Sequence, residues 1–193
     1  MQPDVNIRQF MDVNYYGCVY PTIAALPHLQ ESASGGRIVV VSSLGGLIPF
    51  PRQTLYNASK YALLGFFDTL RMELQSRRST ISISTICPGF IKTEITAGGG
   101  LGRDGKPVGT SMDPTAVNKG AVNGKKKSAG GGVAMISAAD CATQVIEAAD
   151  ARRHTTIVPK YPYSIIYTLR KFFPAAIDAL LIKMYAPPPQ KKL

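Results

Sequence analysis

Ser43, Tyr56 and Lys60 are the residues whose types and spacing best suit proton-transfer chemistry. Tyr56 and Lys60 are four residues apart, so on a helix they share one face and the lysine ammonium can lie near the tyrosine phenol. An unperturbed tyrosine, with a pKa of about 10, is a poor base at neutral pH, but a nearby positive charge favours its phenolate form. Ser43 follows a predicted strand, and its hydroxyl can hold a substrate oxygen on which charge develops. Together the three residues predict that Tyr56 donates and accepts a proton.

Alternating helix and strand patterns surround these residues. Apolar residues at three- and four-residue steps predict a helix over residues 5–32, bent near Pro21 because proline lacks a backbone amide. The β-branched run in residues 37–41 predicts a strand that is buried on both faces. Similar patterns predict a long helix over 54–77, a strand over 81–87, a helix from its N-cap Ser137 to about Ala151, and a strand over 155–158. This order predicts an α/β fold in which helices cover a parallel sheet.

Four short motifs around the three residues follow the order of a known family. Residues 38–43 (IVVVSS) end in Ser43, and residues 56–63 (YNASKYAL) begin thirteen residues after it. Residues 13–17 (VNYYG) precede them and residues 87–93 (CPGFIKT) follow. Through these motifs the sequence resembles the short-chain dehydrogenase/reductase family over most of residues 10–97. The resemblance implies hydride transfer between a nicotinamide dinucleotide and an alcohol or carbonyl carbon.

The resemblance also implies a role for each site residue. Tyr56 would exchange the proton with the substrate oxygen, and Ser43 would hydrogen-bond that oxygen. Lys60 would bind the nicotinamide ribose and lower the Tyr56 pKa, while Asn14 would hold a water in the proton relay. Tyr56 and Lys60 would thus also contact the cofactor, NAD or NADP, and no metal ion is implied. The other cofactor-binding residues, expected around the nicotinamide carboxamide, are Pro88, Gly89, Ile91 and Thr93.

The rest of the chain resembles the hydroxysteroid-dehydrogenase-like branch of the family. Residues 96–113, the helix from Ser137, Arg152–Arg153 and the aromatic, basic tail carry this resemblance. It implies a small lipophilic alcohol or carbonyl substrate, steroid- or retinoid-like. Members of the branch are commonly anchored at the endoplasmic reticulum, so the resemblance implies an intracellular protein at that membrane surface or in the cytoplasm.

The family's opening segment is not found in this sequence. Its strand, Gly-rich turn and pyrophosphate-binding helix come first in the family, whereas this chain begins near the helix that carries Asn14. The expected fold is therefore the C-terminal part of a Rossmann-like doubly wound parallel sheet, incomplete, with about three parallel strands. Residues 100–105 match the pattern Gly-x-Gly-x-x-Gly. No predicted strand runs directly into them and no predicted helix follows, so no dinucleotide site is expected there. An exposed apolar sheet edge is expected beside Val39 and Val41, and the isolated chain is expected to be marginally stable.

Two functions remain open at this point. In the first, the chain is a truncated form of a complete oxidoreductase, inactive alone because its dinucleotide-binding half is absent. In the second, it is a short product without catalysis that acts as an interaction or sheet-completing module. The resemblance also implies a homo-oligomer, with the helix over 54–77 as the contact surface.

The length of 193 residues suits one domain, which divides into four segments. These are the catalytic part (1–97), a flexible Gly/Lys-rich substrate-loop insertion (98–134), a final helix and strand (135–160), and an amphipathic basic tail (161–193). Pro174 is expected to break the tail into two helices, which either pack on the domain or a partner subunit or lie in a membrane surface.

Composition and charge exclude several classes of protein. No stretch of 18 apolar residues and no signal-peptide pattern is found, so neither a membrane-spanning nor a secreted protein is expected. Three distant cysteines form no disulfide framework or metal knuckle, and are expected to be buried thiols in a reducing compartment. The net charge of +10 lies mainly in the insertion and the tail, where residues 151–193 hold eight Lys/Arg and one Asp. Nucleic-acid binding, through Lys125–Lys127 and the tail, is therefore not favoured.

Overall fold

The computed structural model describes residues 4–51, 53–93 and 135–185 of the chain. The predicted insertion over 98–134, with its Gly-x-Gly-x-x-Gly run and its three consecutive lysines, lies outside the described residues. So do the last residues of the tail.

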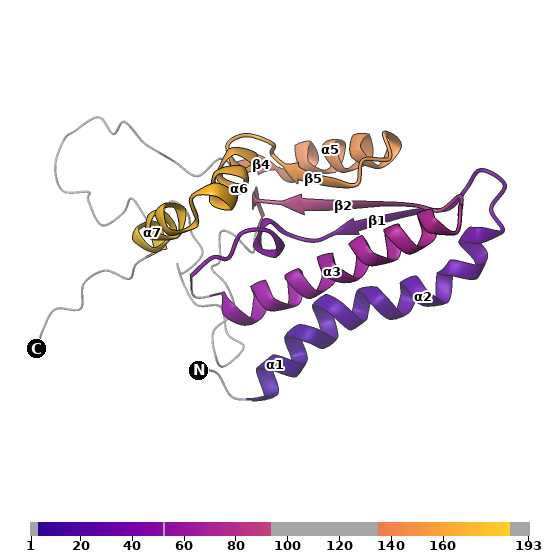
Figure 1. Ribbon diagram of the computed structural model, residues 1–193, viewed down its shortest axis with the longest axis horizontal. Helices are drawn as coiled ribbons and strands as arrows, with labels where there is room; N and C mark the ends of the chain where they lie inside the picture. Colours follow the sequence, from indigo (N-terminus) through magenta and orange to yellow (C-terminus); the bar gives the residue numbers. More distant parts are fainter. Residues whose placement is uncertain (1–3, 52, 94–134, 186–193) are drawn as a thin grey trace, which may run out of the picture.

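A three-stranded parallel sheet forms the centre of the fold (Figure 1). Its strands are β1 (Arg37–Val41), β2 (Ser82–Pro88) and β5 (Thr155–Val158), and β2 lies between the other two. Val40 pairs with Thr85 across β1 and β2, and Cys87 pairs with Ile157 across β2 and β5. The α/β fold with three parallel strands is thus confirmed. A second, two-stranded parallel sheet of β3 (Phe90–Lys92) and β4 (Met135–Ser137) was not predicted.

Helices cover both faces of the central sheet. Figure 1 shows α1 (Asp4–Met11), α2 (Gly17–Gln30) and α3 (Thr54–Ser76) on one side and α5 (Ala138–Asp150) on the other. Leu63 and Phe67 of α3 are buried against Val40 and Ile83, which form the core on the first side. On the second side, the buried residues are Ile86, Ala148 and Val158. Ser137 caps α5 as predicted, since its hydroxyl accepts a hydrogen bond from the amide of Asp140 at 3.0 Å.

The N-terminal helix is interrupted before Pro21 and not at it, which corrects the sequence interpretation. Residues Asp12–Tyr16 form a π-helical turn, η1, in which the Gly17 amide donates to the carbonyl of Asp12, five residues back. Pro21 lies inside α2. The spacing of apolar residues along the sequence does not reveal where the pattern of backbone hydrogen bonds in a helix changes. A single π-helical turn often marks a functional segment. The turn carries Asn14.

Strand β1 is buried on one face only, so the prediction of a strand buried on both faces is wrong. Val40 is buried under α3, whereas Val39 and Val41 are 40% and 54% exposed. The reason is that β1 is an edge strand whose side chains alternate between the two faces, and α3 covers one of them. The exposed apolar edge expected beside Val39 and Val41 is present.

The C-terminal tail forms two helices at the carboxyl ends of the strands (Figure 1). Helix α6 (Tyr163–Phe172) ends just before Pro174, where α7 (Pro174–Tyr185) begins, as predicted. Tyr163 of α6 and Leu181 of α7 are buried against Leu44 and Ile48. The inner face of the pair therefore packs on the domain. Among the helices that the structure describes, none has the length and apolar character needed to cross a membrane.

Candidate active site

Ser43 and Tyr56 meet at the carboxyl end of β1. Ser43 is the N-cap of η2 (Leu44–Gly46), a short 3-10 helix, and its hydroxyl oxygen accepts a hydrogen bond from the Gly45 amide at 3.1 Å. The same hydroxyl lies beside the side chain of Tyr56, in the first turn of α3, and acts to lower the pKa of that phenol. The predicted pair therefore lies close together, although the two residues come from different elements.

Two glycines allow this contact, and the sequence analysis missed them. A Cβ atom at Gly45 would lie 2.7 Å from Oδ1 of Asn57 and 3.1 Å from Cε1 of Tyr56. A Cβ atom at Gly46 would lie 2.9 Å from the carbonyl oxygen of Lys60 and 2.7 Å from Cδ1 of Leu64. Only hydrogen fits at these positions, so η2 rests directly on α3. The available signal was a Gly-Gly pair two residues after Ser43, which is typical of close backbone approach.

Replacing Gly46 by alanine is expected to lower the free energy of unfolding by about 1–3 kcal/mol, because the new methyl group overlaps a helix carbonyl that cannot move aside. Gly65→Ala is the matched control on α3, where a Cβ atom meets nothing within 4 Å. This control is expected to stabilise the helix by about 0.5–1 kcal/mol. Urea unfolding of both variants measures the difference, and equal midpoints would contradict the close approach.

Burial dominates the electrostatics of Tyr56 and Lys60. It raises the pKa of Tyr56, and the hydrogen bond from Ser43 opposes that rise. Burial also lowers the pKa of Lys60, although the nearby Cys18 and Cys87 act to raise it. The Lys60 ammonium lies 5.8 Å from the centroid of the Tyr56 ring. Burial therefore outweighs the influence of Ser43 on the Tyr56 pKa, and the lowering of this pKa by Lys60 stays a prediction.

Asn14 is tied to the backbone beneath Tyr56 through Ser59. The side-chain amide of Asn14 donates to the Ser59 hydroxyl at 3.0 Å, and that hydroxyl donates to the carbonyl of Tyr56 at 2.7 Å. Ser59 is fully buried. The π-helical turn η1 and the first turn of α3 are thus joined next to the Ser43–Tyr56 pair. Asn14 was predicted at the site, whereas Ser59 was not. The only sign of Ser59 in the sequence was that a polar residue lies on the buried face of a predicted helix.

Of the four residues expected around the carboxamide, Pro88 ends β2 and the other three follow it, at the sheet edge where Ser43 lies. The Gly89 amide donates to the carbonyl of Val158 at 2.7 Å. A Cβ atom at Gly89 would lie 2.4 Å from the ring of Tyr163, so this glycine allows α6 to approach β2. Pro88 and Ile91 are half-buried and Thr93 is exposed.

The chain is expected to lose stability as the pH rises from about 9 to about 12. Burial raises the pKa of Cys87 to about 12 and the pKa of Tyr163 to about 12, from 9.0 and 10.0. Over this range the folded chain keeps the Cys87 and Tyr163 protons, whereas the unfolded chain releases them. The contribution of these two groups to the free energy of unfolding is therefore complete at lower pH and declines as the pH rises. Urea midpoints measured across this range should fall less steeply for Tyr163→Phe than for the control Tyr161→Phe, which alters an exposed tyrosine. Equal slopes would contradict the assignment.

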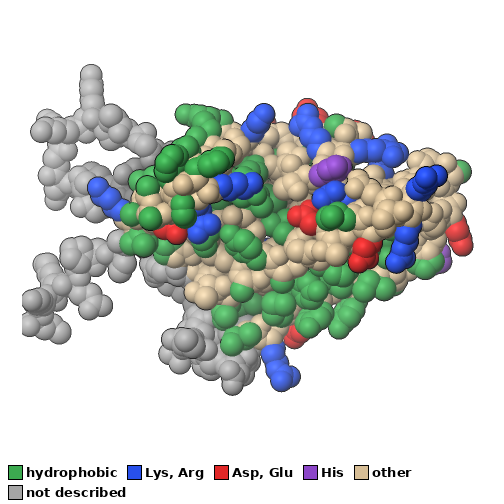
Figure 2. Space-filling model, in the orientation of Figure 1, with side chains coloured by type: hydrophobic (Ala, Val, Ile, Leu, Met, Phe, Trp, Pro, Cys, Tyr) green, Lys and Arg blue, Asp and Glu red, His purple; other side chains and the backbone are tan. Residues whose placement is uncertain are grey.

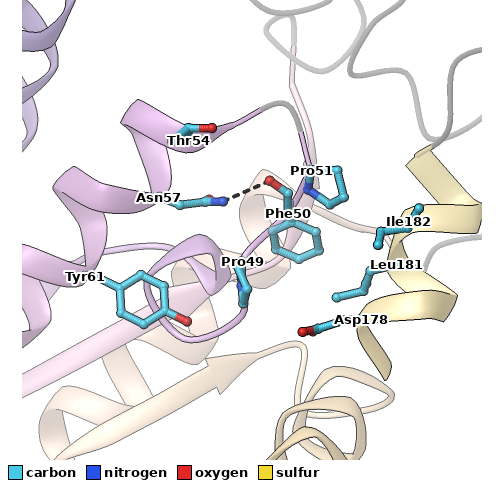
Figure 3. Close-up of a pocket in the computed structure, with 9 residues that line it drawn as sticks. All are labelled: Pro49, Phe50, Pro51, Thr54, Asn57, Tyr61, Asp178, Leu181 and Ile182. Atoms are coloured by element: carbon cyan, nitrogen blue, oxygen red, sulfur yellow. Dashed lines mark hydrogen bonds between the residues drawn. The ribbon is translucent and has the colours of Figure 1, made fainter. Parts of the chain in front are cut away.

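A pocket of about 430 Å³ lies between the start of α3, the preceding loop and α7 (Figure 3). Figure 3 shows Tyr61 of α3 on one side and Leu181 and Ile182 of α7 on the other. The side-chain amide nitrogen of Asn57 donates to the carbonyl of Phe50 at 3.0 Å, which fixes the loop to the helix. The remaining residues that line the pocket are Pro49, Pro51, Thr54 and Asp178. The pocket is mainly apolar and adjoins α3, but Ser43, Tyr56 and Lys60 do not line it.

The three cysteines are free, and Cys87 alone is buried, whereas Cys18 and Cys141 are half-buried. Within the described ranges, no three His, Cys, Asp or Glu side chains are grouped to hold a metal ion.

Residues 1–101 match the model of a protein family described as short chain dehydrogenase. The chain belongs to the short-chain dehydrogenase family. The expectation from the four motifs is therefore confirmed, and the match includes Asn14, Ser43, Tyr56 and Lys60.

Curated and solved relatives agree with this family. This short-chain dehydrogenase is 31% identical to 11-beta-hydroxysteroid dehydrogenase 1A of Arabidopsis thaliana over 171 residues, 89% of this chain and 44% of that protein. It is 44% identical to 11-beta-hydroxysteroid dehydrogenase A of Arachis hypogaea over 105 residues, 54% of this chain and 29% of that protein. The relatives' names agree with the resemblance to the hydroxysteroid-dehydrogenase-like branch. The chain spans less than half the length of these two relatives.

Two solved structures share the fold. A short-chain dehydrogenase/reductase from Burkholderia phymatum, in complex with NAD, superposes with a TM-score of 0.59 at 21% identity, covering 94% of this chain and 59% of that one. One from Sphingobium yanoikuyae, in complex with NADPH, also has a TM-score of 0.59, at 19% identity, covering 100% of this chain and 61% of that one. The Rossmann-like fold class is thereby confirmed.

Proposed function

We propose that this short-chain dehydrogenase carries the proton-transfer site of an NAD(P)-dependent oxidoreductase that interconverts a secondary alcohol and a carbonyl. The observation that supports this most is that the Ser43 hydroxyl lies beside the Tyr56 phenol and acts to lower its pKa, with the Lys60 ammonium on the same side of α3. A hydroxyl pair beside a half-buried cation suits an oxygen that gains and loses negative charge.

The raised pKa of Tyr56 favours its role as proton donor. At neutral pH the phenol keeps its proton, so in the reducing direction Tyr56 protonates the substrate oxygen while Ser43 hydrogen-bonds that oxygen. In the oxidising direction Tyr56 must act as phenolate, which the Ser43 hydrogen bond and a cation at Lys60 favour. Asn14 holds a relay water near the first turn of α3. The dinucleotide, when bound, supplies or accepts the hydride.

The donors at the site fit a nicotinamide ribose. The half-buried Lys60 ammonium has no carboxylate partner among the residues the structure describes, and burial disfavours its charge. Ribose hydroxyls would supply the missing hydrogen-bond acceptors. Pro88, Gly89, Ile91 and Thr93 lie at the carboxyl edge of the sheet, where ligands of open α/β sheets bind. Solved neighbours hold NAD in one case and NADPH in the other, which supports either cofactor.

A lipophilic substrate is supported by two independent features. The relatives are named hydroxysteroid dehydrogenases, and steroids are apolar molecules with a few polar groups. The pocket beside α3 is lined mainly by apolar side chains, among them Phe50, Leu181 and Ile182. We therefore propose a small lipophilic alcohol or carbonyl compound as substrate. A homo-oligomer with α3 as contact surface is proposed from the membership of the family.

The alternative function, a non-catalytic interaction or sheet-completing module, is favoured by one observation. Val39 and Val41 of the edge strand β1 are exposed, and an apolar strand edge can pair with another strand. The same edge suits the catalytic proposal, in which a dinucleotide-binding segment pairs with β1 and the described chain is inactive without it.

Joining the chain to the dinucleotide-binding half of a solved relative distinguishes the two functions. The catalytic proposal predicts that the joined protein oxidises or reduces steroid alcohols and ketones, measured by the absorbance of reduced nicotinamide, and that the chain alone does not. The module alternative predicts stable folding of the chain alone and no turnover in either protein. Turnover by the chain alone would contradict the proposed need for a second segment.

A further inference from the structure

Asn57 is a buried polar residue whose side chain contacts two segments that precede α3. It follows Tyr56 directly in the first turn of α3 and is 7% exposed. Its side-chain amide nitrogen donates to the carbonyl of Phe50, as Figure 3 shows. Its Oδ1 atom lies against Gly45 of η2, where a Cβ atom would come within 2.7 Å of it. The roles proposed above for the catalytic residues do not use this side chain.

The contact with Gly45 connects Asn57 to Ser43. The Gly45 amide donates to the Ser43 hydroxyl at 3.1 Å, and the Gly46 amide donates to the Ser43 carbonyl at 2.9 Å. Ser43 is therefore tied to η2 through both its side chain and its backbone. Because Ser43 caps η2 and Tyr56 belongs to α3, any displacement of η2 from α3 moves the two hydroxyls apart. Asn57 contacts η2 from the α3 side and thus helps to set their separation.

The hydrogen bonding of Asn57 is incomplete, which calls for a reason beyond packing. Its side-chain nitrogen has the Phe50 carbonyl as acceptor, whereas Oδ1 is buried and has no hydrogen-bond partner among the described residues. An unpaired buried acceptor destabilises a fold, and the groups that remain unpaired in native proteins often lie at functional sites. An apolar side chain would avoid this penalty but would not hold the Phe50 carbonyl.

We propose that Asn57 is a positioning residue, which holds η2 and the Phe50 loop against α3 so that the Ser43 hydroxyl stays beside the Tyr56 phenol. The inference rests on the proposed function, because that function requires the two hydroxyls to act on one substrate oxygen. Asn57 also lines the pocket beside α3. A role as pocket wall alone would affect KM, whereas a positioning role affects kcat through Ser43.

Amide hydrogen exchange of the full chain tests the positioning without any turnover. Asn57→Ala removes both contacts, so the Gly45 and Gly46 amides should exchange about five- to tenfold faster, while amides between β1 and β2 keep their rates. Thr54→Ala is the matched control, because Thr54 is an exposed residue of the same pocket wall, and it should change neither set. Figure 2 shows apolar side chains gathered over α1 and α2, so two chain concentrations are compared to exclude self-association as the cause. Unchanged exchange in η2 would overturn the proposal.

A pair of substitutions tests the contact between Asn57 and Gly45 itself. Gly45→Ala alone places a methyl group against Oδ1 of Asn57 and should lower the urea midpoint. In the Asn57→Ala background the same methyl group has room on that side and meets Cε1 of Tyr56 at 3.1 Å. The double variant should therefore be more stable than the two separate losses predict, and it should fold even if Asn57→Ala alone does not. Additive losses, or an unfolded double variant, would overturn the proposal.

Initial rates of the joined, cofactor-competent protein give a readout that a merely structural role would not move. Asn57→Ala should lower kcat by about 10–10²-fold with a smaller change in KM, because the Ser43 hydroxyl is misplaced. In the Ser43→Ala background it should change kcat little, since the hydroxyl that it positions is absent. Equal kcat losses in both backgrounds, or a loss confined to KM, would overturn the positioning role. If the joined parent protein had no turnover, the proposed function would fail, and the exchange rates in η2 would still decide whether Asn57 holds this turn.

Discussion

Replacing Tyr56 by phenylalanine is expected to lower kcat of the joined, cofactor-competent protein by about 10²–10⁴-fold, with little change in substrate binding. The substitution removes only the hydroxyl that lies beside Ser43, so the proton donor is lost while the ring that lies near Lys60 remains. The free energy of unfolding should change little, because the ring keeps its packing. Initial rates in both directions measure the effect.

Tyr161→Phe is the matched control for this substitution. Tyr161 is 73% exposed between β5 and α6, and it does not line the pocket. Its loss of a hydroxyl should leave kcat within a few-fold of the parent protein. If both variants lost activity equally, or if Tyr56→Phe kept full activity, Tyr56 would not be the proton donor.

The second large effect is on stability. Phe67→Ala is expected to lower the free energy of unfolding by about 3–5 kcal/mol, because Phe67 is 1% exposed between α3 and the sheet and its removal leaves a cavity. Small domains are stable by only about 5–15 kcal/mol, and the three-stranded sheet has an exposed edge at β1. The variant should therefore unfold at a markedly lower temperature than the parent chain.

Met72→Ala on the same helix serves as the control for Phe67→Ala. Met72 is 63% exposed, and a surface substitution of this kind typically changes stability by less than about 0.5 kcal/mol. Thermal and urea unfolding followed by circular dichroism measure both variants. A cooperative transition of Phe67→Ala close to that of the parent chain would show that the packing between α3 and β1 does not hold the domain together.

The sequence allowed the order of elements to be predicted because each element carries its own local pattern. The β5 strand and the break at Pro174 agree with their predicted positions, since a β-branched run and a proline act locally. The small sheet of β3 and β4 was missed, because its two strands are three residues long and are far apart in the chain. Burial of β1 was overestimated for a related reason: its residue types do not reveal that one of its faces lacks a covering helix.

The candidate site was predictable in its residues and not in its electrostatics. The spacing of Ser43, Tyr56 and Lys60 was sufficient to bring them to one place, and the structure adds the glycine pair that permits their contact. The sign of the Tyr56 pKa shift depends on how much protein surrounds the phenol, which a sequence does not show. Burial raises that pKa in spite of the nearby lysine.

A double-mutant cycle at Ser43 and Tyr56 tests most directly whether the two hydroxyls act as one site. The measurement is kcat of the joined protein for Ser43→Ala, Tyr56→Phe and the double variant. The two hydroxyls lie close together, so we predict strong non-additivity, with the double variant about as slow as Tyr56→Phe alone. Independent losses that multiply in the double variant, or full activity of either single variant, would contradict the proposed site.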